Sequence, residues 1–287
     1  MPRRVVGEVA MLKEQSFDTG GITINYATCP GGGSPLVLFH GFTDRWQDFL
    51  PIIPSLATRW RLFAPDMRGH GHTSRVPGGV YRRADLLADA VAFLKGVVEG
   101  PAVLFGHSAG AFPVVGVAAE HPELCRAVIV GDMPLDLQYL TSVVHQPQMI
   151  AYHAAVRDLA SLPTRQILPR LAELTPDRGP AARFDDAESL HHLDPRVLDC
   201  HAEGRFGDLM GDFDGDALLS RIGAPVLLLQ ADPRCGGLMP DGYTEHALLL
   251  LPNGFSVRLD GVGHDLGLET WQVAALLGTL VPFLESL

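Results

Sequence analysis

The chain contains little cysteine and no long apolar run. Its four cysteines, Cys29, Cys125, Cys200 and Cys235, are far apart among 287 residues and form no CxxC pair. This spacing argues against a structural zinc site, and a chain of this length needs no disulfide bonds to fold. No stretch approaches the ~18 apolar residues of a membrane-spanning helix. We therefore expect reduced thiols, a cytoplasmic location and no membrane partner.

Positive charge is also in short supply. The 22 Lys and Arg residues are outnumbered by 33 Asp and Glu, which gives a formal charge of −11. Nucleic-acid binding needs a basic face, so we expect no nucleic-acid partner, and no basic cluster suggests a phosphorylated substrate. The segment 1–14 starts with basic residues, as a secretory signal does, but Glu8, Lys13 and Glu14 interrupt its apolar part. We expect no signal peptide there.

Short apolar runs alternate with helical patterns along most of the chain. Such alternation is typical of a mostly parallel sheet with helices on both faces. Helices are expected at Tyr81–Val97, Ala109–His121 and Thr270–Leu287. The expected strands are Ile22–Ala27, Leu36–His40, Arg61–Pro65, Ala102–Gly106, Ala127–Gly131, Pro225–Gln230 and Ser256–Asp260.

One long region breaks this alternation. Between about Leu135 and Gly215 no convincing buried strand occurs, and several prolines divide the segment into helical fragments. The simplest account is a helical insertion between two strands of one sheet. We expect an α/β core formed by residues 1–134 and 216–287, and a helical cap formed by residues 135–215.

A serine follows the apolar run at 102–106 in the sequence Gly-His-Ser-Ala-Gly, with Ser108 at its centre. This G-x-S-x-G pattern gains meaning between a strand and a helix, where a tight turn exposes the hydroxyl. Gly106 and Gly110 are small enough for the strand and the helix to approach each other. We interpret Ser108 as a catalytic nucleophile.

Acyl transfer also needs N–H donors aimed at the oxyanion. On a turn of this kind, one donor is the amide of the residue after the serine, here Ala109, and the other lies in a loop after an earlier strand. The run at 36–39 leads into His40, Gly41 and Phe42, so we expect the Phe42 amide to be the second donor. His40 is interpreted as a residue that holds this loop.

Four segments together resemble the α/β-hydrolase superfamily, namely HGF at 40–42, DMRGHGHTS at 66–74, GHSAG at 106–110 and GVGHD at 261–265. The resemblance implies an eight-stranded, mostly parallel sheet with a first antiparallel strand and a helical cap after the sixth strand. It places the catalytic histidine at His264, a residue type suited to moving the serine proton. Dehalogenases and epoxide hydrolases of this superfamily carry Asp at the nucleophile position, and Ser108 argues against both activities.

The carboxylate that would orient His264 has two candidate positions. The usual position follows the strand at 225–230, but there the expected site holds Arg234, with Asp232 displaced beside it. Asp132 ends the strand at 127–131, and a haloalkane dehalogenase group, the coelenterazine luciferases and the zearalenone-type lactonases place the acid there. We favour Asp132 and keep Asp232 as the alternative.

No metal or cofactor site stands out. His191, His192 and His201 lie among acidic residues of the expected cap, and the segment 212–216 resembles a calcium loop without its terminal Glu. We interpret the latter as a solvated turn and expect neither a metal nor a cofactor. For the substrate pocket we expect cap residues that include Leu135, Tyr139, Met149 and His153.

The leading interpretation is a serine hydrolase that cleaves an ester or lactone of a small, largely apolar molecule. Carbon–carbon bond hydrolysis and acyl transfer use the same three side chains and stay open as alternatives, and fold alone does not decide between them. A binding protein without catalytic activity is a further alternative. We expect a monomer or a homodimer.

Overall fold

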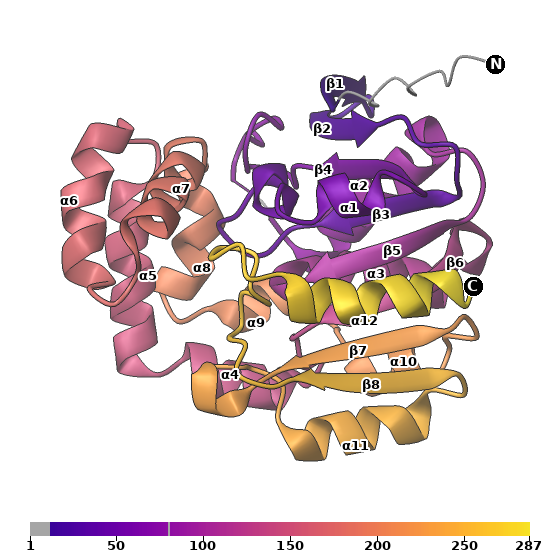
Figure 1. Ribbon diagram of the computed structural model, residues 1–287. Helices are drawn as coiled ribbons and strands as arrows, with labels where there is room; N and C mark the ends of the chain where they lie inside the picture. The colour runs from indigo at the N-terminus through magenta and orange to yellow at the C-terminus, as the bar shows by residue number, and fades with distance from the viewer. Residues whose placement is uncertain (1–11, 80) are drawn as a thin grey trace.

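One sheet of eight strands organises the chain, in the order β1-β2-β4-β3-β5-β6-β7-β8 (Figure 1). The computed structural model describes residues 12–79 and 81–287, so the basic start of the chain lies outside the described residues. The strands are β1 (Lys13–Asp18), β2 (Thr23–Cys29), β3 (Pro35–Phe39), β4 (Arg61–Pro65), β5 (Ala102–His107), β6 (Cys125–Gly131), β7 (Val226–Ala231) and β8 (Gly254–Leu259). The expected fold class is confirmed.

The strands from β3 to β8 run parallel, and β2 runs antiparallel to both β1 and β4. The reversed strand is therefore the second in the chain, which corrects the expectation of a reversed first strand. The additional strand, β1, has the sequence Lys-Glu-Gln-Ser-Phe-Asp and five exposed side chains. It carries no apolar run because it lies at the edge of the sheet, where few of its side chains are buried.

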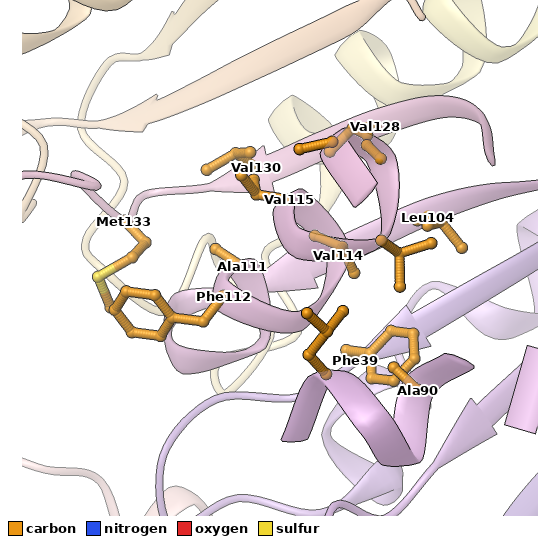
Figure 2. Packing of buried hydrophobic residues seen from close by; sticks show 14 of the residues in the cluster. Phe39, Ala90, Leu104, Ala111, Phe112, Val114, Val115, Val128, Val130 and Met133 are labelled. Carbon is orange, nitrogen blue, oxygen red and sulfur yellow. The ribbon is translucent and has the colours of Figure 1, made fainter. Parts of the chain in front are cut away.

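Helices cover both faces of the sheet. On one face, the buried residues of β3, β5 and β6 pack with α2 (Arg83–Val97) and α3 (Ala111–Glu120), and with the helices α10 (Gly215–Leu219) and α11 (Asp241–Leu250). Figure 2 shows this cluster around Leu104, Val114 and Val128. On the other face, α1 (Ile53–Leu56) and α12 (Ala274–Glu285) pack against the alternate strand residues. The apolar runs in the sequences of β3, β5 and β7 are continuous because both faces of these strands are buried.

Six helices of the described chain lie between β6 and α10. They are α4 (Leu137–Val144), α5 (Pro147–Leu159), α6 (Thr164–Leu174), α7 (Pro180–His191), α8 (Asp199–Ala202) and α9 (Phe206–Met210). In Figure 1, α5, α6, α7 and α8 stand beside one end of the sheet. Buried residues of α5, α6 and α7 share one apolar cluster. None of the helices in the described part of the chain is long and apolar enough to cross a membrane.

Candidate active site

Ser108 stands at a sharp turn between β5 and α3. Its φ of +49° lies in the left-handed region, where a non-glycine residue is strained. A Cβ atom at Gly106 would come 2.3 Å from the Gly110 carbonyl oxygen, and one at Gly110 would come 2.3 Å from the Phe39 carbonyl oxygen. Only glycine fits at these two positions, so the backbone forces the Ser108 side chain out of the turn.

His264 lies in the loop after β8 and contacts Ser108 directly. Its Nε2 is 2.9 Å from Ser108 Oγ, and its Nδ1 is 2.8 Å from Asp132 Oδ2. The His264 carbonyl also accepts a hydrogen bond of 2.7 Å from Nε2 of His107, the residue before Ser108. Burial lowers the pKa of His107 to about 4, so this imidazole is neutral and acts as a donor.

Asp132 follows β6 and is fully buried. Its φ of +47° is again left-handed, and this turn directs the carboxylate toward His264. Oδ1 accepts hydrogen bonds from the amides of Ala231 (3.0 Å) and Met239 (3.2 Å), and Oδ2 accepts one from the Leu238 amide (2.7 Å). Three backbone donors and one imidazole therefore satisfy both oxygens.

Asp232 holds the loop after β7 instead of contacting His264. Its carboxylate accepts hydrogen bonds from the Arg234 backbone and guanidinium and from the Gly261 amide. The Arg234 guanidinium and these amides hold the pKa of Asp232 well below its usual range. The structure thus brings Ser108, His264 and Asp132 into hydrogen-bond contact. The Asp232 carboxylate instead binds Arg234 and the Gly261 amide.

The loop after β3 approaches Ser108 closely. A Cβ atom at Gly41 would come 3.3 Å from Ser108 Cβ. The Phe42 amide next to it donates no hydrogen bond to any described residue. His40 holds this loop, because its Nδ1–H donates to the Gly41 carbonyl (2.8 Å) and its Nε2 accepts from the Met67 amide (2.9 Å). An unpaired amide beside the serine is what an oxyanion donor requires.

The Phe42 side chain packs against two histidines of the inserted helices. Its ring centroid is 4.3 Å from that of His201 and 5.9 Å from that of His153, and the two histidine rings are 5.0 Å apart. Burial lowers the pKa of His201 to about 3, so this ring is neutral. The inserted helices therefore touch Phe42, which lines the same cavities as Ser108.

An apolar chamber of about 400 Å³ extends from Ser108 between the sheet and the helices α4, α5, α8 and α9. Tyr139, Met149 and His153 line it, as the sequence suggests. Leu135 does not, which corrects that expectation: its side chain is 2% exposed and packs in the core, where a Cβ atom at Gly215 would meet it. Met133, two residues earlier, lines the chamber in its place.

A second cavity, of about 300 Å³, also opens on Ser108 and His264, and we call it the acidic arm. Its charged lining residues are Asp44, Arg178, Asp186, Asp265 and Glu269. Arg178 donates to both oxygens of Asp186 (2.6 and 2.7 Å) and lies 2.5 Å from Glu269. Burial raises the pKa of Asp44, Asp186 and Glu269. Sequence reasoning missed this arm, because only the fold brings these distant residues together.

The described residues contain no group of three or more His, Cys, Asp or Glu side chains that could hold a metal ion. In the segment that resembles a calcium loop, Asp214 instead accepts a hydrogen bond from the Ala217 amide and caps α10. The His191 and His192 rings contact each other at a steep inclination of 59°, with centroids 4.8 Å apart.

Comparison with known proteins relates this architecture to a family. The family model described as alpha/beta hydrolase fold matches residues 34–192. 2-(Acetamidomethylene)succinate hydrolase of Mesorhizobium japonicum is 36% identical over 115 residues, which are 40% of this chain and 41% of that protein. The magnesium-chelatase 30 kDa subunit of Rhodobacter capsulatus is 27% identical over 270 residues, or 90% of this chain and 89% of that one.

A solved structure extends the likeness over the whole fold. The crystal structure of E-2-(acetamidomethylene)succinate hydrolase superposes with a TM-score of 0.76 and 24% sequence identity, and the alignment covers 96% of this chain and 100% of the other. The family model covers more than half of the present chain, from β3 to the end of α7. The chain belongs to the alpha/beta hydrolase fold family.

Proposed function

We propose that this protein is a serine hydrolase that cleaves a carboxylic ester or lactone of a small molecule. One observation carries the proposal: the unbroken series of hydrogen bonds from Ser108 through His264 to the buried Asp132, at the floor of an apolar chamber. A serine hydroxyl is a weak nucleophile by itself, and a histidine held by a carboxylate is the arrangement that activates it.

In the first half of the reaction, Ser108 Oγ attacks the carbonyl carbon and its proton passes to His264 Nε2. The imidazolium that forms is stabilised by the Asp132 carboxylate, which is 2.8 Å from Nδ1. The carbonyl oxygen becomes an oxyanion beside the amides of Phe42 and Ala109. His264 then gives its proton to the departing alkoxide as the carbon–oxygen bond breaks, which leaves an acyl group on Ser108.

In the second half, a water molecule takes the position of the alcohol. His264 accepts a proton from this water as its oxygen attacks the acyl carbon, and it returns the proton to Ser108 Oγ when the acid leaves. The net change is one water consumed, one acid and one alcohol formed. A lactone gives both groups in one product, because its leaving alcohol stays attached to the acyl part.

The lining of the chamber supports a largely apolar substrate. Tyr139, Met149 and Phe112 border it together with aliphatic residues of α4 and α9. Burial of apolar substrate surface supplies about 25 cal/mol per Å². Tyr139, Met149 and His153 are the residues we assign to substrate binding.

Carbon–carbon bond hydrolysis is the second candidate. The relative 2-hydroxymuconate semialdehyde hydrolase of Pseudomonas, by its name, acts on a molecule that contains neither an ester nor an amide. The same serine, histidine and aspartate serve that chemistry when the leaving group is a stabilised carbanion. Acyl transfer differs only in the acceptor, an alcohol or amine instead of water.

A fluorophosphonate probe tests the proposal, because it phosphonylates an activated serine and spares an ordinary one. We expect labelling of Ser108 in the folded protein and none in Ser108→Ala. A panel of short-chain, long-chain and aryl esters beside a set of lactones and vinylogous 1,5-diketones then identifies the bond that is cleaved. If the folded protein is not labelled at Ser108, the proposed function is wrong.

A further inference from the structure

One charged residue is among those that line the apolar chamber. Among the described residues that line it, Arg83 is the single Lys, Arg, Asp or Glu. Arg83 is the first residue of α2, and the remaining side chains of the lining are apolar or neutral polar groups. A lone cation in such a lining is costly to bury unless an anion reaches it.

The partners that Arg83 has within the described residues leave most of its donors unused. Nη2 lies 3.6 Å from Asp212 Oδ1, and the Asp212 side chain is 99% exposed. The guanidinium carbon is 5.3 Å from the centre of the Phe213 ring. Nε and Nη1 are buried and have no hydrogen-bond partner in the described part of the chain. Since an exposed ion pair contributes little, the buried guanidinium is poorly satisfied.

Aromatic contacts connect Arg83 to the region next to the nucleophile. The Phe213 ring packs edge-on against Phe112, with centroids 5.4 Å apart, and Phe112 lines the chamber four residues after Ser108. Figure 2 shows Phe112 and Met133 at one end of the core cluster. Arg83 and Ser108 thus border the same cavity, and the wall between them is apolar.

The two cavities that open on Ser108 differ in their ionisable lining residues. The acidic arm holds four carboxylates, Asp44, Asp186, Asp265 and Glu269, against one guanidinium. The chamber holds Arg83 and no carboxylate among its described lining residues. An anionic group of a substrate therefore meets a poorly paired guanidinium in the chamber, whereas in the acidic arm Arg178 is already paired with Asp186 and Glu269.

From this arrangement we infer that Arg83 binds a carboxylate of the substrate. The inference rests on the proposed function and narrows it: the substrate is an ester or lactone that carries a carboxylate separated from the scissile carbonyl by an apolar spacer. A guanidinium matches a carboxylate with two parallel N–H donors, a geometry that an ammonium does not offer. The carboxylate occupies the chamber side, and the leaving group occupies the acidic arm.

Kinetics with paired substrates test this subsite. The substrates are 4-nitrophenyl half-esters of linear dicarboxylic acids and the same compounds with the free carboxylate capped as a methyl ester. We expect Arg83→Gln to lower kcat/KM for the half-esters by about 10- to 100-fold, mainly through KM, and to leave the capped compounds nearly unchanged. Arg83→Lys keeps the positive charge but lacks the two parallel N–H donors, so we expect a smaller loss of kcat/KM for the half-esters than in Arg83→Gln.

Arg82→Gln is the matched control, because Arg82 precedes Arg83 in the chain but its side chain is exposed and does not line the chamber. It should leave both substrate sets unchanged. Equal losses on half-esters and capped compounds in Arg83→Gln overturn the inference, as does a wild-type protein that does not prefer the half-esters.

A binding measurement separates this inference from the proposed function. Calorimetry on Ser108→Ala, which needs no turnover, compares octanoate with octanamide. We expect octanoate to bind more tightly and its affinity to fall about tenfold or more when Arg83→Gln is added, with octanamide unaffected. Equal binding of the two ligands refutes the carboxylate subsite even if Ser108 is labelled. Preferential octanoate binding without labelling of the wild-type protein refutes the hydrolase and upholds the subsite.

Discussion

The acid of the candidate triad is tested most sharply by exchanging Asp132 for Asn. In the wild-type site, Oδ1 accepts from the Ala231 and Met239 amides, and Oδ2 accepts from the Leu238 amide and His264 Nδ1. An asparagine keeps the most hydrogen bonds when its Oδ1 faces the pair of amides and its NH₂ group replaces Oδ2. The opposite orientation would turn the NH₂ group against two N–H donors.

The preferred orientation reverses the tautomer of the histidine. The NH₂ group of the new side chain donates to His264 Nδ1, so the imidazole proton moves to Nε2, which is 2.9 Å from Ser108 Oγ. A protonated Nε2 cannot accept the serine proton. We therefore expect Asp132→Asn to lower kcat by about 10⁴-fold. The Leu238 amide loses its acceptor, which costs about 1–3 kcal/mol, within the 5–15 kcal/mol stability that is usual for a domain.

The assay is the turnover of 4-nitrophenyl butyrate together with thermal unfolding followed by circular dichroism. Asp232→Asn is the matched control, because it removes the same charge from the alternative acid. Asp232 contacts Arg234 and Gly261 and does not contact His264, so we expect kcat close to that of the wild type. Near-normal turnover in Asp132→Asn, with a large loss in Asp232→Asn, would refute our reading of the site and give the role to Asp232.

Three further perturbations probe the turn, the loop and the inserted helices. Gly110→Ala puts a Cβ atom 2.3 Å from a β3 carbonyl oxygen, so we expect the free energy of unfolding in urea to fall by about 1–3 kcal/mol. The control Gly242→Ala, where nothing lies within 4 Å of the new Cβ atom, should not lower this free energy. His40 has a pKa lowered to about 4 by burial, so the unfolded chain binds more protons between pH 6.5 and 4 and the free energy of unfolding falls as pH drops through that range. Measured by denaturation at each pH, His40→Asn should reduce the total fall in the free energy of unfolding over this range by about 3 kcal/mol, and an unchanged fall would contradict the argument. His201→Ala should lower kcat by about 10- to 100-fold, with little change in KM, because the Phe42 ring loses its stacking partner; His201→Phe should restore the rate, and failure of that rescue would exclude a positioning role.

The sequence predicts much of the fold because the central strands are buried on both sides. Uninterrupted apolar runs mark β3, β5, β6 and β7, and shorter or mixed apolar patterns locate β2, β4 and β8. β1 escapes detection because its exposed side chains carry no apolar periodicity. Because β1 is not recognised, the reversed strand is expected to be the first in the chain, whereas it is the second, β2.

The candidate site is only partly encoded in local patterns. Ser108 and His264 stand in motifs whose strand and loop context is visible in the chain. The sequence favours Asp132 over Asp232 through a resemblance but does not decide between them, because each follows a buried strand. The choice depends on the left-handed turn at Asp132 and on the Arg234 contact of Asp232. Arg83 gives no signal at all, since an Arg-Arg pair at the start of a helix is ordinary and only its unsatisfied burial distinguishes it.

The three amides that hold Asp132 have a consequence for how this protein can change. They belong to residues 231, 238 and 239, and they act through the main chain, so the identity of those side chains does not matter to the carboxylate. Leu238 and Gly236 of the same loop line the chamber. Variation at the exposed or chamber-lining positions of this loop can therefore reshape the cavity while the acid keeps its anchors. Proline is excluded at 231, 238 and 239, where it would remove a donor amide, and the fully buried Ala231 and Met239 also need side chains that fit the core. A mutagenesis library aimed at new substrates is best placed in this segment, because its side chains shape the cavity while its main-chain amides hold the catalytic acid.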